Sequence, residues 1–136
     1  MSEANHPLLE RARIGILISN RKDGSPIGVP VWFEWDGETL RCFADRTSQK
    51  ITRLRRNPRA SLLVTNDVGE PDQWIAFDGD FAITDKAGIE VAERIAAGYW
   101  DLNNPELKAT LEQWKQAPEA FALLEMKPER IRRGNG

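Results

Sequence analysis

The stretch "GSPIGVPVWFEWDGETLRCFADRTSQKITRLRRNPRASLLV", residues 24 to 64, decides the fold. It begins with a Gly-Ser-Pro turn, continues as an alternating apolar strand at 27–35, and turns through "DGET" into a second strand at 40–45. A short basic segment, 48–56, has the length of about two helical turns and ends before Asn57-Pro58, a stop signal. Strands joined by short turns predict an antiparallel sheet with one helix inserted in it.

The rest of the chain extends this pattern. We expect six strands, at residues 13–19, 27–35, 40–45, 59–66, 73–84 and 121–133. Helices are expected at 6–13 and 48–56. A third is expected where apolar residues recur at helical spacing, namely Ile89, Ala92, Ile95, Ala96 and Tyr99. A fourth begins with Asn104 as its cap and Pro105 at its first position, and it is expected to bury Leu107, Leu111 and Trp114. Strands and helices do not alternate, so a doubly wound parallel sheet is not expected. The order predicts one mainly β domain over 1–136, an antiparallel barrel or sandwich with helices over its open ends.

Composition points to an ordinary globular protein. Hydrophobic residues make up 40% of the chain and charged residues 29%, with a net charge of −2. No apolar run approaches the roughly 18 residues that span a bilayer, and the N-terminus has no apolar signal-peptide core, so we expect no membrane partner and a cytoplasmic location. The slightly acidic whole argues against general nucleic-acid binding. A nucleic-acid-binding barrel stays a minor alternative, because basic residues of 46–59 lie near aromatic strands.

Several kinds of chemistry are excluded by what the sequence lacks. It contains no G-x-G-x-x-G, no phosphate loop ending in GK[ST] and no H-E-x-x-H. His6 is the only histidine, which excludes a histidine-dependent triad and a zinc site with several imidazoles, and we expect a solvated side chain. Cys42, the only cysteine, is expected in the core. Asp78 and Asp80 flank Gly79 as at a bulge, so no metal site is assigned, and no residue stands out as catalytic.

The start of the basic helix is the clearest candidate site. Thr47 and Ser48 are good cap residues, and free N–H groups with the positive end of the helix dipole favour an anion, above all a phosphate. Lys50 lies in the first turn beside the buried face, whereas Arg53 and Arg56 are expected on the solvated face. Spacing alone is explained slightly better by a capped surface helix with an ordinary charged exterior.

Pro30 indicates a second feature. A proline inside an apolar strand belongs at a sheet edge or beside a gap, and Trp32 shares its face. The indole has two interpretations, a stacking platform for a planar ring or ordinary core packing, and packing is the better supported of the two. Trp74 heads a later strand that Gly79 interrupts, as glycine does at a close backbone approach.

Together these segments resemble the pyridoxamine 5′-phosphate oxidase-like superfamily of flavin-binding split barrels. The resemblance rests on the order of a G-x-P turn, a P-V-W strand, a hairpin, S-x-K before "LRRNPR", the strand "WIAFDGDFAIT" and the closing "MKPERIR". It covers roughly 8–84 and 120–133. It implies a six-stranded antiparallel Greek-key split barrel, usually a homodimer with flavin mononucleotide (FMN) between the subunits.

Carried over by position, the resemblance implies a set of cofactor-binding residues. Ser48, Gln49 and Lys50, with the preceding Thr47, would meet the phosphate. The remaining residues would line the ring and the ribityl chain: Val29, Pro30, Val31, Trp32, Phe43, Ala44 and Trp74. Trp74 stands where the family has a ring-contacting glutamine.

Departures from the family pattern limit the activity that is implied. The oxidase proper has arginine where this chain has Gly28 and Gln49, and a C-terminal R-x-H pair where this chain reads "PERIRRGNG". Vitamin B6 oxidase activity is therefore not expected. The chain resembles small members that use FMN or the deazaflavin coenzyme F-420.

The leading hypothesis is an FMN-dependent oxidoreductase that transfers a hydride to or from an unidentified small organic substrate. The alternatives are a deazaflavin-dependent reductase, whose longer anionic tail would contact Arg53, Arg55 and Arg56, and a non-catalytic flavin or haem carrier or sensor.

Overall fold

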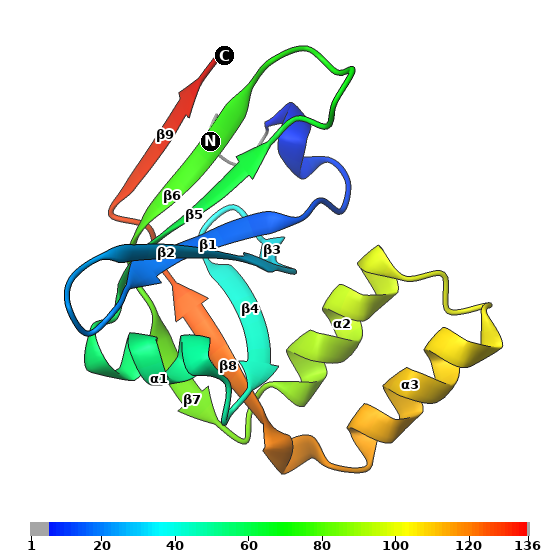
Figure 1. Ribbon diagram of the computed structural model, residues 1–136. Coiled ribbons are helices and arrows are strands. Elements are labelled where there is room, and N and C mark those ends of the chain that lie inside the picture. The colour runs from blue at the N-terminus through cyan, green and yellow to red at the C-terminus, as the bar shows by residue number, and fades with distance from the viewer. Residues whose placement is uncertain (1–5, 136) are drawn as a thin grey trace.

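The computed structural model describes residues 6–135, and their strands form two antiparallel sheets (Figure 1). One sheet has the order β2-β1-β5-β6-β9 and the other β3-β4-β8-β7. The strands are β1 (Gly15–Asn20), β2 (Pro26–Val31), β3 (Glu34–Trp35), β4 (Leu40–Asp45), β5 (Arg59–Thr65), β6 (Trp74–Asp80), β7 (Ala82–Asp85), β8 (Phe121–Met126) and β9 (Arg130–Gly134). The helices are α1 (Gln49–Arg56), α2 (Ile89–Tyr99) and α3 (Pro105–Lys115), with 3₁₀ turns at Pro7–Leu9 and Pro118–Ala120. The predicted mainly β class is confirmed.

The number of strands was wrong for one repeated reason. Three of the six expected strands cross from one sheet to the other and break at the crossing: β2 gives way to β3 at Trp32-Phe33, β6 to β7 at Phe81, and β8 to β9 at 127–129. Residues 6–135 therefore hold nine strands. A strand that bends between two sheets closes a corner of the barrel without leaving a long free edge, and its apolar alternation continues through the bend.

The core lies between the two sheets. Alternate side chains point inward from each, among them Leu17, Leu62, Val64 and Phe77 from one sheet and Leu40, Cys42, Leu124 and Met126 from the other. Cys42 is 1% exposed, and burial raises the pKa of its thiol to about 12, so its predicted core role is confirmed. A Cβ at Gly79 would lie 3.1 Å from the Met126 side chain. This close packing explains the glycine inside β6.

The N-terminal segment differs from the expected helix at 6–13. Only Pro7–Leu9 forms a 3₁₀ turn, and the imidazole of His6 accepts the Leu8 N–H at 3.1 Å through Nδ1. The prediction that His6 is solvated was wrong, because the side chain is only 6% exposed. Burial, followed by the positive charge of Arg133, lowers its pKa.

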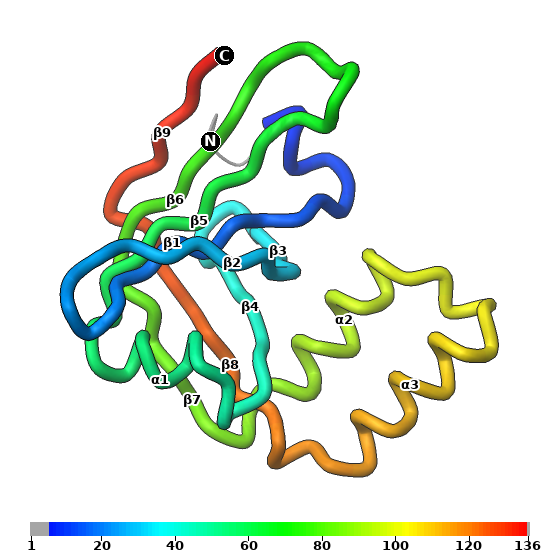
Figure 2. Tube along the Cα trace, viewed as in Figure 1, coloured from blue at the N-terminus to red at the C-terminus, as the bar shows by residue number. Residues whose placement is uncertain are grey.

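The two later helices follow the prediction closely. They lie side by side, with α2 next to β4 and β8 and α3 on its outer side (Figures 1 and 2). In α2 the buried face comprises Val91, Ala92, Ile95 and Ala96. Asn104 caps α3 by accepting the Glu106 N–H at 2.9 Å, and Leu111 is buried, whereas Leu107 and Trp114 are half-buried. In the part of the chain that the structure describes, no helix is long and apolar enough to cross a membrane.

Candidate cofactor site

A tight turn at the end of β4 leads the chain into α1. The Asp45 carboxylate accepts hydrogen bonds from the Thr47 N–H at 2.8 Å and the Thr47 hydroxyl at 2.6 Å. The Ser48 N–H donates to the Asp45 carbonyl at 2.9 Å, and Ser48 becomes the N-cap with extended backbone angles. Thr47 was expected to cap the helix, but its hydroxyl is occupied by Asp45.

The start of α1 has unused hydrogen-bonding capacity. Ser48 makes no side-chain cap bond, and its hydroxyl oxygen is buried without a partner. Within residues 6–135 no oxygen accepts from the N–H groups of Gln49, Lys50 or Ile51, and no acidic residue lies in the first turn. Free donors at a positive helix end make a suitable site for an anion.

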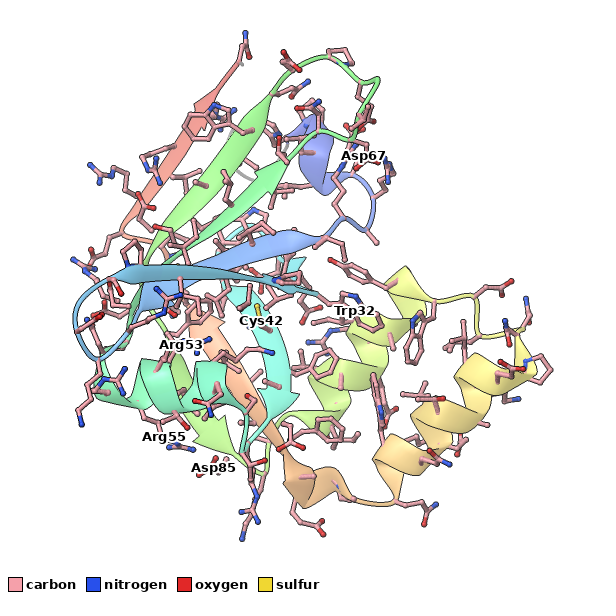
Figure 3. All side chains as sticks on the ribbon, in the orientation of Figure 1. Trp32, Cys42, Arg53, Arg55, Asp67 and Asp85 are labelled. Atoms are coloured by element: carbon pink, nitrogen blue, oxygen red, sulfur yellow. The ribbon has the colours of Figure 1, made fainter. Side chains whose placement is uncertain are left out.

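The cations around α1 have few protein partners. Lys50 is half-buried, and its positive charge lowers the Cys42 pKa against the larger effect of burial. Among the described residues, no carboxylate lies within ion-pair distance of Arg46, Lys50, Arg53 or Arg56. By contrast, Arg55 pairs with Asp85 at 2.5 Å (Figure 3).

Arg53 does not lie on a solvated face as predicted. It is half-buried, and its Nε is buried without a partner. Figure 3 shows its side chain on the side of α1 that faces β1 and β2, whereas Arg55 points toward Asp85. Helical spacing placed Arg53 away from Ile51 and Leu54, but it could not show that strands lie along the helix on that side.

The expected ring-lining residues come from two neighbouring places. Val29, Pro30 and Val31 lie in β2, which is an edge of its sheet, so the predicted edge position of Pro30 is confirmed. Phe43 and Ala44 lie in β4, just before the turn into α1. The rings of Trp32 and Phe43 have their centroids 6.3 Å apart, which connects the end of β2 to β4.

Trp74 is not part of this group within one chain. It begins β6, whereas α1 lies near the opposite end of this strand, where Asp80 pairs with Arg59 just after the helix. The indole instead packs against Gly134, where a Cβ would lie 2.9 Å from the ring, and the Arg132 guanidinium lies 5.7 Å from the ring centroid.

Sequence reasoning missed a cluster of aromatic side chains beside the site. Trp32 stacks on Tyr99 with centroids 4.9 Å apart and an interplanar angle of 16°, and it meets Trp100 edge-on at 5.0 Å. The Tyr99 hydroxyl donates to the Arg13 carbonyl and accepts the Phe33 N–H at 3.2 Å. Tyr99 therefore holds both residues of the β2–β3 crossing. Tyr99 and Trp114 were recognised only as positions at helical spacing.

A hollow of about 790 Å³ lies elsewhere, where β1, β5, β6 and β9 run together. Its arginines are already neutralised: Asp78 accepts from Arg132 Nε at 2.6 Å and from Arg130 Nε at 3.4 Å, and also from the Ser61 hydroxyl at 2.6 Å. These contacts, the Arg132 bond foremost, hold the Asp78 pKa well below its usual range. Despite its size, this hollow offers less unpaired positive charge to an anion than the start of α1.

Several solved structures share this fold. An F420 reductase is 24% identical, covers 92% of this chain and 93% of its own, and superposes with a TM-score of 0.74. General stress protein 26 from Bacillus anthracis is 22% identical over 93% of this chain and 87% of its own, with a TM-score of 0.66. An FAD-binding protein from Mesorhizobium loti is 22% identical over the same shares, with a TM-score of 0.61. At these identities the likeness establishes the fold alone.

No curated protein matches the chain. The family model for pyridoxamine 5′-phosphate oxidase matches residues 1–133, nearly the whole length. Some structures of this fold are named for a flavin or F420. The chain belongs to the pyridoxamine 5′-phosphate oxidase family.

Proposed function

We propose that this protein is a small FMN-dependent oxidoreductase that holds the cofactor phosphate at the start of α1. The observation that carries the proposal is the set of donors without an acceptor in residues 6–135, the Ser48 hydroxyl and the N–H groups of residues 49–51, beside Lys50, which has no carboxylate partner there. Ser48, Gln49 and Lys50 hold the phosphate, and Thr47, whose N–H and hydroxyl both donate to Asp45, shapes the turn before them. Val29–Trp32 and Phe43-Ala44 line the ring. When bound, the flavin ring supplies the hydride chemistry.

The protein's own contribution is binding and orientation. A phosphate dianion satisfies N–H groups that otherwise lack acceptors, and Lys50 adds a charge-assisted bond. The Trp32 ring is held in place, because Tyr99 stacks on one of its faces and Trp100 meets it edge-on. Among the described residues none is placed as an acid or base, which fits a reaction in which the cofactor carries the redox step.

Titration with FMN tests the proposal directly. Apo protein is titrated in a calorimeter, and the flavin absorption band of the complex is recorded. We expect one FMN per chain with micromolar or tighter affinity. Protein that remains colourless and releases no heat at micromolar FMN contradicts the assignment.

We further propose that two copies complete the site. Trp74 lies away from α1 within its own chain, so it contacts the ring only if it comes from a partner. Ile16, Ile18 and Leu63 point outward from the five-stranded sheet, because they alternate with buried Leu17 and Leu62. Helix α2 lies against β4 and β8 with α3 packed on α2, and the pair leaves this face free for a second copy (Figures 1 and 2).

The oligomeric state tests this part separately. Light scattering should give twice the 15.4 kDa chain mass. Leu63→Arg should give a folded monomer that has lost FMN affinity, whereas Val68→Arg, at a fully exposed position, should remain a dimer. A monomeric wild-type protein that still binds FMN would rule out the shared site.

One observation favours a deazaflavin as the cofactor. A deazaflavin cofactor has a longer anionic tail than FMN. Within residues 6–135, Arg46, Arg53 and Arg56 have no carboxylate partner, whereas Arg55 is held by Asp85, so a tail that runs from the start of α1 along the helix would meet free cations. Arg53→Ala should then weaken F420 binding strongly and FMN binding little. If the wild-type protein bound F420 and FMN with equal affinity, the anionic tail of F420 would contribute nothing to binding, and this alternative would lose its support.

The haem alternative is less well supported by the structure. Haem iron needs an axial ligand, usually from histidine, cysteine, methionine or tyrosine. In residues 6–135 the candidates His6, Cys42 and Met126 are all buried, and the Tyr99 hydroxyl bonds to two backbone groups.

A further inference from the structure

Six aromatic side chains form a continuous surface between the barrel and the α2–α3 pair, which we call the aromatic wall. Its members are Trp32, Phe43, Tyr99, Trp100, Trp114 and Phe121. All six are half-buried. Phe33, Phe77 and Phe81, by contrast, are 8%, 0% and 3% exposed. The chain thus buries the rings that fill its core and leaves the rings of the wall partly open.

The wall has two connected parts. Trp32 and Phe43 belong to the proposed cofactor site, whereas Trp100 and Trp114 come from the helical pair. Trp32, labelled in Figure 3, marks the barrel side of the wall. The ring centroid of Trp114 lies 5.2 Å from that of Trp100 and 5.6 Å from that of Phe43. The surface therefore continues without a break from the proposed ring position to α3.

The polar edges of the wall are open as well. The indole nitrogens of Trp32, Trp100 and Trp114 are neither buried nor bonded to any described residue, unlike that of Trp35, which is buried. Of the residues on α3, only Leu111 is buried, and Trp114 carries the aromatic contacts of the helix to Phe43 and Phe121. A partly exposed apolar surface of this kind next to a cofactor site is where a small ligand binds.

We infer that the aromatic wall binds the substrate and selects a planar, uncharged, apolar molecule. The inference rests on the proposed function, because it places this molecule beside the flavin ring. Aromatic rings attract a planar π system by offset stacking and edge contacts beyond simple burial of area. The wall contains no charged side chain that would attract an ion, and the Tyr99 phenol already serves two backbone groups.

The experiment uses 2-naphthol as the planar probe and decahydro-2-naphthol as its saturated, non-planar counterpart. Proton–nitrogen correlation spectra of the labelled protein show one indole signal for each of the five tryptophans. With 2-naphthol we expect the signals of Trp32, Trp100 and Trp114 to shift and those of Trp35 and Trp74 to stay. The saturated probe should cause shifts only at several-fold higher concentration. Shifts of all five signals, of none, or equal shifts with both probes overturn the inference.

Variants on α3 separate ring contacts from folding. Trp114→Leu keeps an apolar side chain without a ring, and Trp114→Phe keeps a ring. We expect 2-naphthol affinity to fall about 3- to 10-fold in the leucine variant and about twofold in the phenylalanine variant. Leu107→Ala, at a half-buried position on the same helix outside the wall, is the control and should bind as the wild type does. Equal losses in Trp114→Leu and Leu107→Ala would mean that the helix pair had merely loosened.

The two proposals fail in different ways. If FMN and F420 both fail to bind but the three indole signals shift, the cofactor assignment is wrong and the aromatic site remains. If FMN binds, but 2-naphthol shifts none of the three indole signals in either the presence or the absence of FMN, the cofactor site remains and the substrate inference is wrong.

Discussion

Two basic stretches of this protein differ in what surrounds them. Arg11 and Arg13, before β1, face the acidic loop between β5 and β6. Arg13 pairs with Glu70 through two bonds of 2.7 and 3.1 Å, and Arg11 lies 2.6 Å from Asp67. The segment 46–56 around α1 carries more positive charge, yet within residues 6–135 only Arg55 has a carboxylate partner.

The difference separates structural from functional charge. Cations neutralised by the chain itself attach one segment to another, as Arg13 attaches the N-terminal segment to the loop at Glu70. Cations that remain unpaired and lie close together repel one another, so the free energy of the site improves when an external anion binds. The first stretch is therefore expected to govern folding and the second to govern binding.

The largest effect is expected for Lys50→Ala. A charge-assisted bond to phosphate contributes about 1.5–3 kcal/mol, so FMN affinity should fall about 10- to 150-fold. The free energy of unfolding of the apo protein should hardly change, because among the described residues Lys50 has no ion-pair partner to lose. Calorimetric titration and urea unfolding measure the two quantities.

Arg56→Ala is the matched control for this comparison. Arg56 is also unpaired within residues 6–135, but it lies at the C-terminal end of α1 and is exposed. Its loss should change FMN affinity by far less. Similar losses in the two variants would replace a defined phosphate site by diffuse attraction.

The opposite result is expected for Arg13→Met. The methionine fills similar space but loses both bonds to Glu70, which should lower the free energy of unfolding by about 1.5 kcal/mol. FMN affinity should be unchanged. Arg11→Met, which removes an exposed ion pair, should lower the free energy of unfolding by less than about 0.5 kcal/mol. If Arg13→Met weakened FMN binding as much as Lys50→Ala, the division between the two stretches would fail.

Much of this architecture could be predicted because the signals are local. Alternation marked the strands, Asn104-Pro105 marked the start of α3, and Asn57-Pro58 marked the end of α1. The sheet crossings could not be read so easily. At Trp32-Phe33 and Phe81 the apolar pattern continues through the bend, and only the last crossing contains a breaker, Pro128.

The errors at the site concern contacts between distant segments. Arg53 looked solvated because helical spacing says nothing about strands beside the helix. His6 looked solvated because a residue near a chain end usually is, yet here it caps a turn. The aromatic wall was invisible because its rings come from segments as far apart as Trp32 and Phe121. Which carboxylates face Arg13 and which cations face none is likewise a tertiary property.

A smaller effect is expected for Ser48→Ala. The Ser48 hydroxyl is buried without a partner, so removing it should leave the apo protein at least as stable as before. If rotation of this hydroxyl brings it to the cofactor phosphate, FMN affinity should fall about 3- to 10-fold. Thr47→Ala serves as the control, because the Thr47 hydroxyl is bonded to Asp45 at 2.6 Å and is less free to turn. A larger affinity loss for Thr47→Ala would move the phosphate contact off α1.

The smallest effect concerns the pH dependence of the N-terminal segment. Burial lowers the pKa of His6 from its ordinary value of 6.5, so the folded protein binds fewer protons than the unfolded chain just below that pH. Stability should therefore fall as the pH drops from about 7.5 to about 5.5, a window in which most carboxylates remain ionised. Because His6 is the only histidine, His6→Asn should flatten this slope, while the asparagine oxygen can still accept the Leu8 N–H. Urea midpoints at the two pH values provide the measurement. A slope that persists in His6→Asn would trace the pH dependence to another group.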